Sequence, residues 1–306
     1  MYPYFDETVN IPGDDPHTPY VYYDERISLS INVALAISRP LLVTGSPGSG
    51  KSTLAEDAAK RLGWTFLSAT FTSHTRFEDL VAKTDSVSRL ADAQLQRLGR
   101  DSDYLVPGIL WWAFDGESAE QLVDSQPEAH RTHDPRVRSV HDALGTRRGT
   151  VLLLDEIDKA EPDLPNDLLG PLGGDELRLP GGRSIQAPLT NTLVIITSNG
   201  ERALPPAFLR RCVHLDLRTP TAEVLHTIAR SHYGPAHEHI YQGVAARWTT
   251  LAESRAGNSR RTPAVAEYLD TVLACIKLEE APGGESWSEL QAITLDKFAG
   301  RDGWNV

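Results

Sequence analysis

The chain has 306 residues, enough for one large domain or two modest ones with a full hydrophobic core. Acidic residues outnumber basic ones by 42 to 30, and the net charge of −12 disfavours loose binding to nucleic acid or anionic membranes. Two distant cysteines, Cys212 and Cys275, exclude a disulfide framework and a cysteine-based zinc site.

The N-terminal half of the chain alternates helical and strand patterns. Residues 1–24 are rich in Tyr, Pro and Asp and predict an extended arm without a signal-peptide pattern. Apolar runs at 41–44 and 64–70 predict buried strands. The helices predicted in this half lie at 27–38, 52–63 and 85–103.

The middle of the chain is less regular. Residues 115–138 contain few apolar side chains and predict a surface insertion, followed by a helix over about 136–145. Trp111 and Trp112, just before the insertion, are expected in the core, with a channel-facing loop as the alternative. The short basic cluster and the histidines near residue 130 are expected in a solvated face.

The remaining strands of the chain precede a purely helical region. A Gly-rich segment at 173–184 predicts a hairpin, and strands are expected at 151–155, 192–198 and 212–217. Continuous apolar strands alternating with helices predict a parallel sheet that is covered on both faces. We therefore expect an α/β domain over residues 1–218 and an all-α domain over 219–306.

A phosphate-loop pattern, GxxxxGK[ST], lies between the strand at 41–44 and the helix at 52–63. Its residues are Gly45, Ser46, Pro47, Gly48, Ser49, Gly50, Lys51 and Ser52, followed by Thr53. The glycines let backbone N–H groups surround an anion, and the helix N-terminus adds partial positive charge. Lys51 is expected on the β- and γ-phosphates and the Ser52 hydroxyl on Mg²⁺, so the pattern predicts an ATP-binding loop.

Two carboxylates, Asp155 and Glu156, follow the apolar run VLLL at 151–154. A carboxylate at the C-terminal end of a parallel strand faces the ligand crevice of an α/β sheet. Asp155 is therefore expected to bind Mg²⁺, and Glu156 to polarise the attacking water as a general base. The alternative is a strand that simply ends in charged residues.

Several segments in this order resemble the AAA+ ATPases, and within them the MoxR-like group. They are RPLLVTGSPGSGKSTLA at 39–55, PGIL at 107–110, VLLLDEIDKAEPDLPNDLLGPL at 151–172, TSNG at 197–200 and the arginine pair at 210–211. The resemblance covers about residues 18–275. It implies an αβα core with a parallel sheet and a small all-α lid. It also implies a ring, most often a hexamer, with ATP between subunits.

The resemblance also implies roles for individual residues. Asn199 matches sensor 1, which orients the attacking water, and Arg210 and Arg211 match the region of the arginine finger. Arg261, with Arg260 as the alternative, matches sensor 2 at the start of a lid helix that Thr262 and Pro263 are expected to cap. In the arm, Tyr20 and Val21 match the segment that packs on the adenine, although hydrophobic packing alone is the alternative.

These observations predict a cytoplasmic, Mg²⁺-dependent ATPase that remodels or assembles a client protein, with von Willebrand factor A domain proteins as the partners that the resemblance implies. One alternative is an ATP- or GTP-driven motor subunit of a nucleic-acid-processing or restriction-type complex. Another is a nucleotide-gated scaffold with little turnover. Asp158 and Lys159 depart from the Asn-Arg pair of many MoxR proteins, which leaves the role of these two positions open.

Overall fold

The computed structural model describes residues 4–8, 19–136, 149–187, 189–255 and 262–296. The chain divides into two compact units. The first comprises Met1–Asp15, Asp24–Thr44 and Ala55–Asp216. The second comprises Pro16–Tyr23, Gly45–Leu54 and Leu217–Val306.

The core of the first unit is a five-stranded parallel sheet with the order β2-β5-β8-β1-β9. The strands are β1 (Leu41–Thr44), β2 (Thr65–Thr70), β5 (Thr150–Asp155), β8 (Thr192–Ser198) and β9 (Val213–Asp216). Every residue of β8 is buried, which explains why its sequence is a continuous apolar run rather than an alternating one. The predicted parallel sheet is confirmed.

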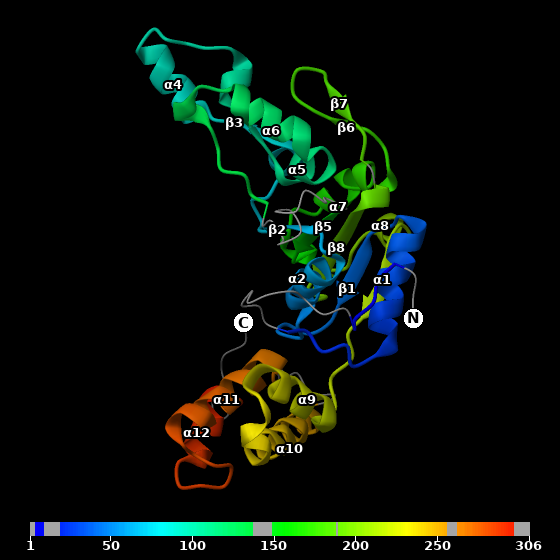
Figure 1. Ribbon diagram of the computed structural model, residues 1–306, viewed down its shortest axis with the longest axis vertical. Helices are drawn as coiled ribbons and strands as arrows, with labels where there is room; N and C mark the ends of the chain where they lie inside the picture. The colour runs from blue at the N-terminus through cyan, green and yellow to red at the C-terminus, as the bar shows by residue number, and fades with distance from the viewer. Residues whose placement is uncertain (1–3, 9–18, 137–148, 188, 256–261, 297–306) are drawn as a thin grey trace. The chain divides into compact units, whose positions relative to one another are not determined.

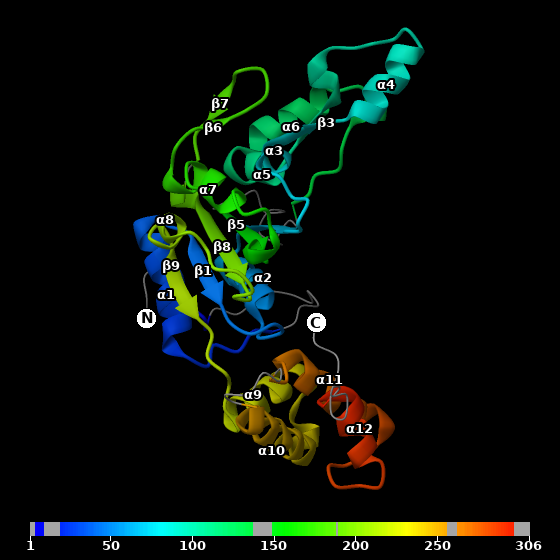
Figure 2. The same cartoon turned by 180° about the vertical axis from the view of Figure 1, so that it is seen from behind.

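Helices cover the sheet, and α1 (Glu25–Ile37) and α2 (Lys51–Leu62) flank β1 on opposite sides in both views (Figures 1 and 2). Helix α1 begins after Asp24, whose carboxylate accepts the N–H of Arg26, and ends at Ser38 in the left-handed conformation. The short helices α7 (Leu164–Asp167) and α8 (Pro206–Leu209) also belong to this unit.

The chain between β2 and β5 forms a lobe of short elements. Within this lobe, α4 lies farthest from the sheet (Figures 1 and 2). Its elements are α3 (Phe77–Val81), β3 (Ala82–Thr84), α4 (Ser86–Gln94), β4 (Leu105–Pro107), α5 (Ile109–Phe114) and α6 (Gly116–Ser125). The predicted helix over 85–103 is too long, because Gln96 adopts a left-handed φ of 54° and the chain leaves the helix after Gln94.

The expectation of a surface insertion over 115–138 is only partly correct, because most of its described residues are exposed or half-buried but one face of α6 is buried. This segment forms α6, which Asp115 caps, and Ala119 and Val123 of α6 belong to the hydrophobic core. In the basic cluster that follows, Arg131 is exposed as expected, but the Arg136 guanidinium is buried over the Trp112 ring. Apart from Arg136, the helix predicted over about 136–145 lies outside the described residues.

Two other side-chain expectations concern this lobe. Trp111 and Trp112 are buried in α5, so the core prediction is confirmed and the channel-facing alternative is wrong for this arrangement. The expectation of a solvated His130 is also wrong, because its ring packs against Tyr104 and its Nε2 lies 3.2 Å from a carboxylate oxygen of Asp92.

The predicted hairpin at 173–184 is confirmed as β6 (Leu177–Arg178) and β7 (Ser184–Ile185).

The second unit contains four α-helices among the residues that the structure describes. They are α9 (Ala222–Tyr233), α10 (Glu238–Arg255), α11 (Val265–Leu278) and α12 (Trp287–Thr294). They enclose a core that includes Tyr241, Trp248 and Tyr268. The expected cap of α11 is wrong: the helix begins after Ala264, whose N–H donates to the Glu267 carboxylate at 2.7 Å.

Short 3-10 helices connect the longer elements. They are η1 (Asp101–Tyr104), η2 (Glu128–His130), η4 (Ile157–Lys159), η5 (Pro171–Gly173), η6 (Leu189–Asn191) and η7 (Pro235–His237). Across the part of the chain that the structure describes, no helix has both the length and the apolar surface that a bilayer crossing requires.

Candidate functional site

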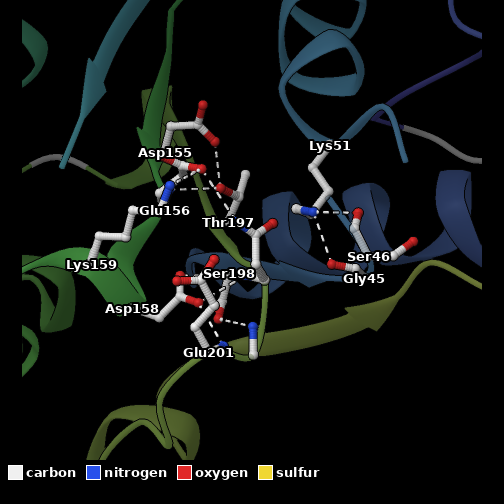
Figure 3. Close-up of polar contacts among 12 residues, drawn as sticks. Gly45, Ser46, Lys51, Asp155, Glu156, Asp158, Lys159, Thr197, Ser198 and Glu201 are labelled. Carbon is white, nitrogen blue, oxygen red and sulfur yellow. Dashed lines mark hydrogen bonds and ion pairs between the residues drawn. The ribbon is translucent and has the colours of Figure 1, made fainter. Parts of the chain in front are cut away.

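The phosphate loop follows β1 and leads directly into α2. A turn from Ser46 to Ser49 precedes Gly50, whose carbonyl accepts the N–H of Leu54 and so starts the helix. Lys51 is buried, and its ammonium donates to the carbonyls of Gly45 and Ser46, both at 2.9 Å (Figure 3). The ammonium therefore already lies against the loop, where it is close to any anion that the loop binds.

The glycines of this loop allow close packing as well as an unusual backbone. Gly48 has a φ of +72°, and a Cβ atom there would lie 2.7 Å from the Cβ of Ala264, at the start of α11. The carbonyl of Gly48 also accepts the N–H of Ala266 at 3.3 Å. Within the second unit, the phosphate loop thus contacts the first turn of the helix that follows the expected sensor 2 residues.

The arm residues that we expect at the adenine are in the same unit. Tyr20 is buried, and its ring contacts Gly50, where an added Cβ would lie 3.2 Å from the ring. The Tyr20 and Tyr22 rings meet edge to face at 5.1 Å, and Val21 is half-buried. The arm therefore packs beside the loop, whereas Arg260 and Arg261 lie outside the described residues. At the start of α2, Ser52 is exposed and Thr53 half-buried.

In the first unit, the expected acidic residues lie where β5 ends, next to the end of β8. The Thr197 hydroxyl on β8 donates to Oδ1 of Asp155 and accepts the N–H of Glu156 at 2.9 Å. Glu156 adopts a left-handed backbone with φ 61° and ψ 49°, which is uncommon for a residue with a side chain. Thr197 therefore fixes both the carboxylate of Asp155 and the backbone turn at Glu156.

The side chain of Glu156 is held by two donors (Figure 3). Its Oε1 accepts from the Asn199 amide at 3.2 Å and from the Lys159 ammonium at 2.9 Å. The hydrogen bond to Glu156 is the main cause that raises the pKa of Lys159 above its usual value. The expected general base and the expected sensor 1 are thus in direct contact.

Asp158 holds the loop that carries Asn199. The Asp158 carboxylate is buried and accepts the N–H of Asn199 at 3.1 Å and the N–H of Glu201 at 2.9 Å. A carboxylate that accepts two backbone N–H groups restrains the loop strongly. This contact sets the position from which the Asn199 side chain reaches Glu156.

The two arginines of the expected finger region, Arg210 and Arg211, follow α8 and are exposed. The carbonyl of Arg210 accepts a hydrogen bond from the Arg39 guanidinium at 3.3 Å. Within the described residues, neither arginine side chain forms an ion pair, and neither contacts Glu156 or Asn199. Both side chains therefore lie at the surface of the first unit.

Sequence reasoning missed three residues of this cluster as functional candidates: Thr197, Asp158 and Lys159. Thr197 interrupts the apolar run of β8 two residues before Asn199, and this interruption is a usable signal because β8 is otherwise buried and apolar. Asp158 and Lys159 stood out only as a departure from the Asn-Arg pair of many MoxR proteins, and that departure did not indicate a role for either residue.

Each unit, taken by itself, supplies an oxygen donor of a kind that magnesium prefers. Mg²⁺ is usually held by one or two protein oxygens, with phosphate oxygens and water completing its coordination. Asp155 is half-buried with a carboxylate oriented by Thr197, and Ser52 presents a hydroxyl at the first turn of α2. The described residues contain no cluster of three or more His, Cys, Asp or Glu side chains that would hold a metal on its own.

Comparisons with known proteins found a family model, a curated relative and a solved structure that are similar to this chain. The family model of the AAA domain (dynein-related subfamily) matches residues 40–212. The chain is 32% identical over 146 residues to the aerobic cobaltochelatase subunit CobS of a Sinorhizobium species, a match that covers 48% of this chain and 39% of that protein. A crystal structure of a putative ATPase from Cytophaga hutchinsonii aligns with 71% of this chain and 52% of its own, at 16% identity and a TM-score of 0.43.

The fold and the phosphate-loop motif define a nucleotide-binding domain of the α/β class. Because the family model matches more than half of the chain, the protein belongs to the AAA domain family, dynein-related subfamily. The AAA+ ATPase that the sequence motifs predicted is thereby confirmed. The chain spans about two fifths of the length of the curated relative, so nothing of that protein's activity follows directly.

Proposed function

We propose that this protein binds ATP with Mg²⁺ at its phosphate loop and hydrolyses the γ-phosphate with Glu156 as the general base. The observation that carries this proposal is the hydrogen bond between Glu156 and Asn199. The two residues follow the ends of the neighbouring parallel strands β5 and β8, and Glu156 comes directly after Asp155. Membership in the AAA domain family supports the same reaction.

The chain's own residues supply binding, orientation and proton transfer. The backbone N–H groups of the loop and the Lys51 ammonium bind the phosphates, and Lys51 exchanges its two carbonyl partners for phosphate oxygens. Asn199 orients a water molecule, and Glu156 accepts its proton as the water attacks in line. Asp155 and Ser52 hold the magnesium ion, which neutralises charge on the phosphates when it is bound.

We propose that the site is completed by a second copy of the chain. An exposed guanidinium from Arg210 or Arg211 suits the charge of a phosphoryl transition state better than an ammonium does. Residues 219–306 act as the lid in this proposal, and Arg261 or Arg260 carries sensor 2. A ring of copies, most simply a hexamer, follows from the resemblance to MoxR-like proteins.

The work done by hydrolysis is the remodelling or assembly of a client protein, for which a von Willebrand factor A domain partner is the expectation from the resemblance. The relative from Sinorhizobium is named as a subunit of a cobaltochelatase, which supports action within a larger assembly.

The substitution Glu156→Gln tests the reaction. It removes the proton acceptor but keeps an oxygen for Asn199, so we expect phosphate release from ATP to fall by about 100-fold or more while ATP binding persists. Glu161→Gln, on an exposed residue after the same turn, is the matched control and is expected to leave the rate unchanged. Equal rates for Glu156→Gln and the unmodified protein would leave only a nucleotide-gated scaffold.

The shared site has its own test. Mass photometry with and without a non-hydrolysable ATP analogue measures assembly, and phosphate release measured over a dilution series reports whether single copies are active. We expect the rate per copy to fall as the ring dissociates. A constant rate per copy at all dilutions would remove the proposed contribution from a second copy.

A further inference from the structure

The turn after β5 places a lysine against the proposed general base. Glu156 has a left-handed backbone and is followed by η4, in which the N–H of Lys159 donates to the carbonyl of Glu156 at 2.9 Å. This tight turn returns the Lys159 side chain to Glu156, so that its Nζ lies 2.9 Å from Oε1.

The same oxygen is shared with Asn199. Oε1 of Glu156 accepts one hydrogen bond from the Lys159 ammonium and another from the Asn199 amide. In the proposed reaction, Asn199 orients a water molecule and Glu156 takes a proton from it. In this arrangement Glu156 is instead engaged with both Asn199 and Lys159.

The ammonium remains charged at neutral pH. The hydrogen bond from Lys159 to Glu156 raises the pKa of Lys159, and the charges of Glu201 and Asp158 act in the same direction. A carboxylate oxygen that accepts from an ammonium is a poorer proton acceptor, and it must lose a hydrogen bond before it meets a new donor. The ion pair therefore opposes proton transfer for as long as it persists.

A stabilising role for the pair in the folded chain is a weaker explanation. The side chains of Lys159 and Glu156 are 42% and 28% exposed, and ion pairs at such positions contribute little to folding. The position of the pair on the proposed base gives it a larger effect on the reaction than on the fold.

We propose that Lys159 is a positioning residue that holds Glu156 in a resting arrangement, and that its release accompanies each turnover. This inference rests on the proposed ATP hydrolysis. It assigns a role to the position at which the chain departs from the Asn-Arg pair of many MoxR proteins. Lys159 sets how much of the population has a free base, whereas Glu156 performs the proton transfer.

Substitution of Lys159 in the full chain tests the inference. At saturating ATP we expect Lys159→Met to raise kcat by about two- to fivefold. A partly exposed ion pair can change the fraction of molecules with a free Glu156 by about this factor. We expect no change in the KM for ATP, because Lys159 is not among the residues that are proposed to bind the phosphates. Lys159→Arg retains the pair and is expected to keep the rate of the unmodified protein.

Salt provides a readout that a structural role would not change. Screening weakens a partly exposed pair, so the ratio of kcat between Lys159→Met and the unmodified protein is expected to fall towards one as the salt concentration rises. Lys83→Met is the matched control, because Lys83 forms a comparable exposed ion pair with Asp79, at 3.9 Å. It is expected to leave kcat unchanged at every salt concentration.

The outcomes separate this inference from the proposed function. If hydrolysis requires Glu156 but Lys159→Met hydrolyses ATP no faster than the unmodified protein, the resting arrangement is overturned and the proposed function stays in place. If the unmodified protein does not hydrolyse ATP, or is only as active as Glu156→Gln, both the resting arrangement and the proposed function are overturned. A faster Lys159→Arg variant also contradicts the inference, because arginine keeps the charge.

Discussion

The Asn199 amide donates to Oε1 of Glu156 at 3.2 Å, although 43 residues separate them in the chain. The contact exists because β5 and β8 are parallel neighbours, with Leu154 beside Ile196, so that the two strands end at the same edge of the sheet. The phosphate loop begins at the residue after Thr44, and β1 is the other parallel neighbour of β8. Within the first unit, the ends of two neighbouring strands thus place the proposed general base beside the residue that is proposed to orient the water.

Asp158 is predicted to be necessary for the position of Asn199. Asp158→Ala leaves the N–H groups of Asn199 and Glu201 without their carboxylate acceptor. We expect the free energy of unfolding to fall by about 1–3 kcal/mol and kcat to fall by more than about tenfold. Urea denaturation and phosphate release measure the two effects. Asp163→Ala, on an exposed residue of the same connection, is the control, and an equal effect of both variants would refute this role.

Gly48 is predicted to be needed for both its backbone and its lack of a side chain. Gly48→Ala places a Cβ atom 2.7 Å from that of Ala264 and forces alanine into a φ of +72°. We expect ATP binding to weaken by about tenfold or more and the unfolding free energy to fall by about 2 kcal/mol.

A comparison with Gly283 separates the effect of backbone strain at Gly48 from the effect of its close contact with Ala264. It has a φ of +90°, and a Cβ atom added there would meet no other atom of the described residues within 4 Å, so Gly283→Ala tests backbone strain alone. We expect a cost of about 1 kcal/mol and no change in ATP affinity, as measured by calorimetry. Unchanged ATP binding in Gly48→Ala would show that the close contact has no role in the loop.

Arg136 is predicted to stabilise the packing of α6 against α5. Its side chain is 4% exposed, pairs with Asp134 and Glu120, and lies 4.8 Å from the centre of the Trp112 ring. Arg136→Ala is expected to lower the unfolding free energy by about 1–3 kcal/mol, as measured by urea denaturation. Arg89→Ala, whose ion pair with Asp101 is exposed, is expected to change it by less than about 1 kcal/mol. A cost no larger than that of Arg89→Ala would contradict the packing role.

The two cysteines are predicted to resist alkylation in the folded protein. Burial raises the pKa of Cys212 to about 12 and that of Cys275 to about 11, so almost no thiolate exists at mildly alkaline pH. Mass spectrometry after iodoacetamide treatment is expected to find both thiols intact in the native state and both modified in guanidinium chloride. Cys275 is buried and Cys212 is half-buried, and rapid native labelling of either would contradict the raised pKa of its thiol.

Much of the sheet could be predicted because its signal is local. The apolar runs of β1, β5 and β8 are continuous, and each is followed by residues of a chemical type that the carboxyl edge of a parallel sheet requires. The family match confirms the domain that these runs and the phosphate loop indicated. The roles of Lys51, Asp155, Glu156 and Asn199 remain proposals.

The features that sequence reasoning missed depend on long-range or backbone effects. The end of α4 is set by the left-handed Gln96, a residue type that gives no warning of such a conformation. The many polar residues over 115–138 indicate a surface segment, yet Ala119 and Val123 suffice to bury one face of α6. Arg136 pairs with Glu120 and Trp112, which are distant in the chain, whereas Lys159 reaches Glu156 because of the left-handed backbone at Glu156.

Equilibrium binding of ATP in the presence of Mg²⁺ tests the central claim most directly. Calorimetry on the purified full chain is expected to detect ATP binding, which Lys51→Ala weakens by about tenfold or more because a buried charged donor to the phosphates is lost. Lys60→Ala, on the same helix and paired with Glu56, is expected to bind as the unmodified protein does. Absence of ATP binding, or equal affinity of Lys51→Ala and the unmodified protein, would contradict the account.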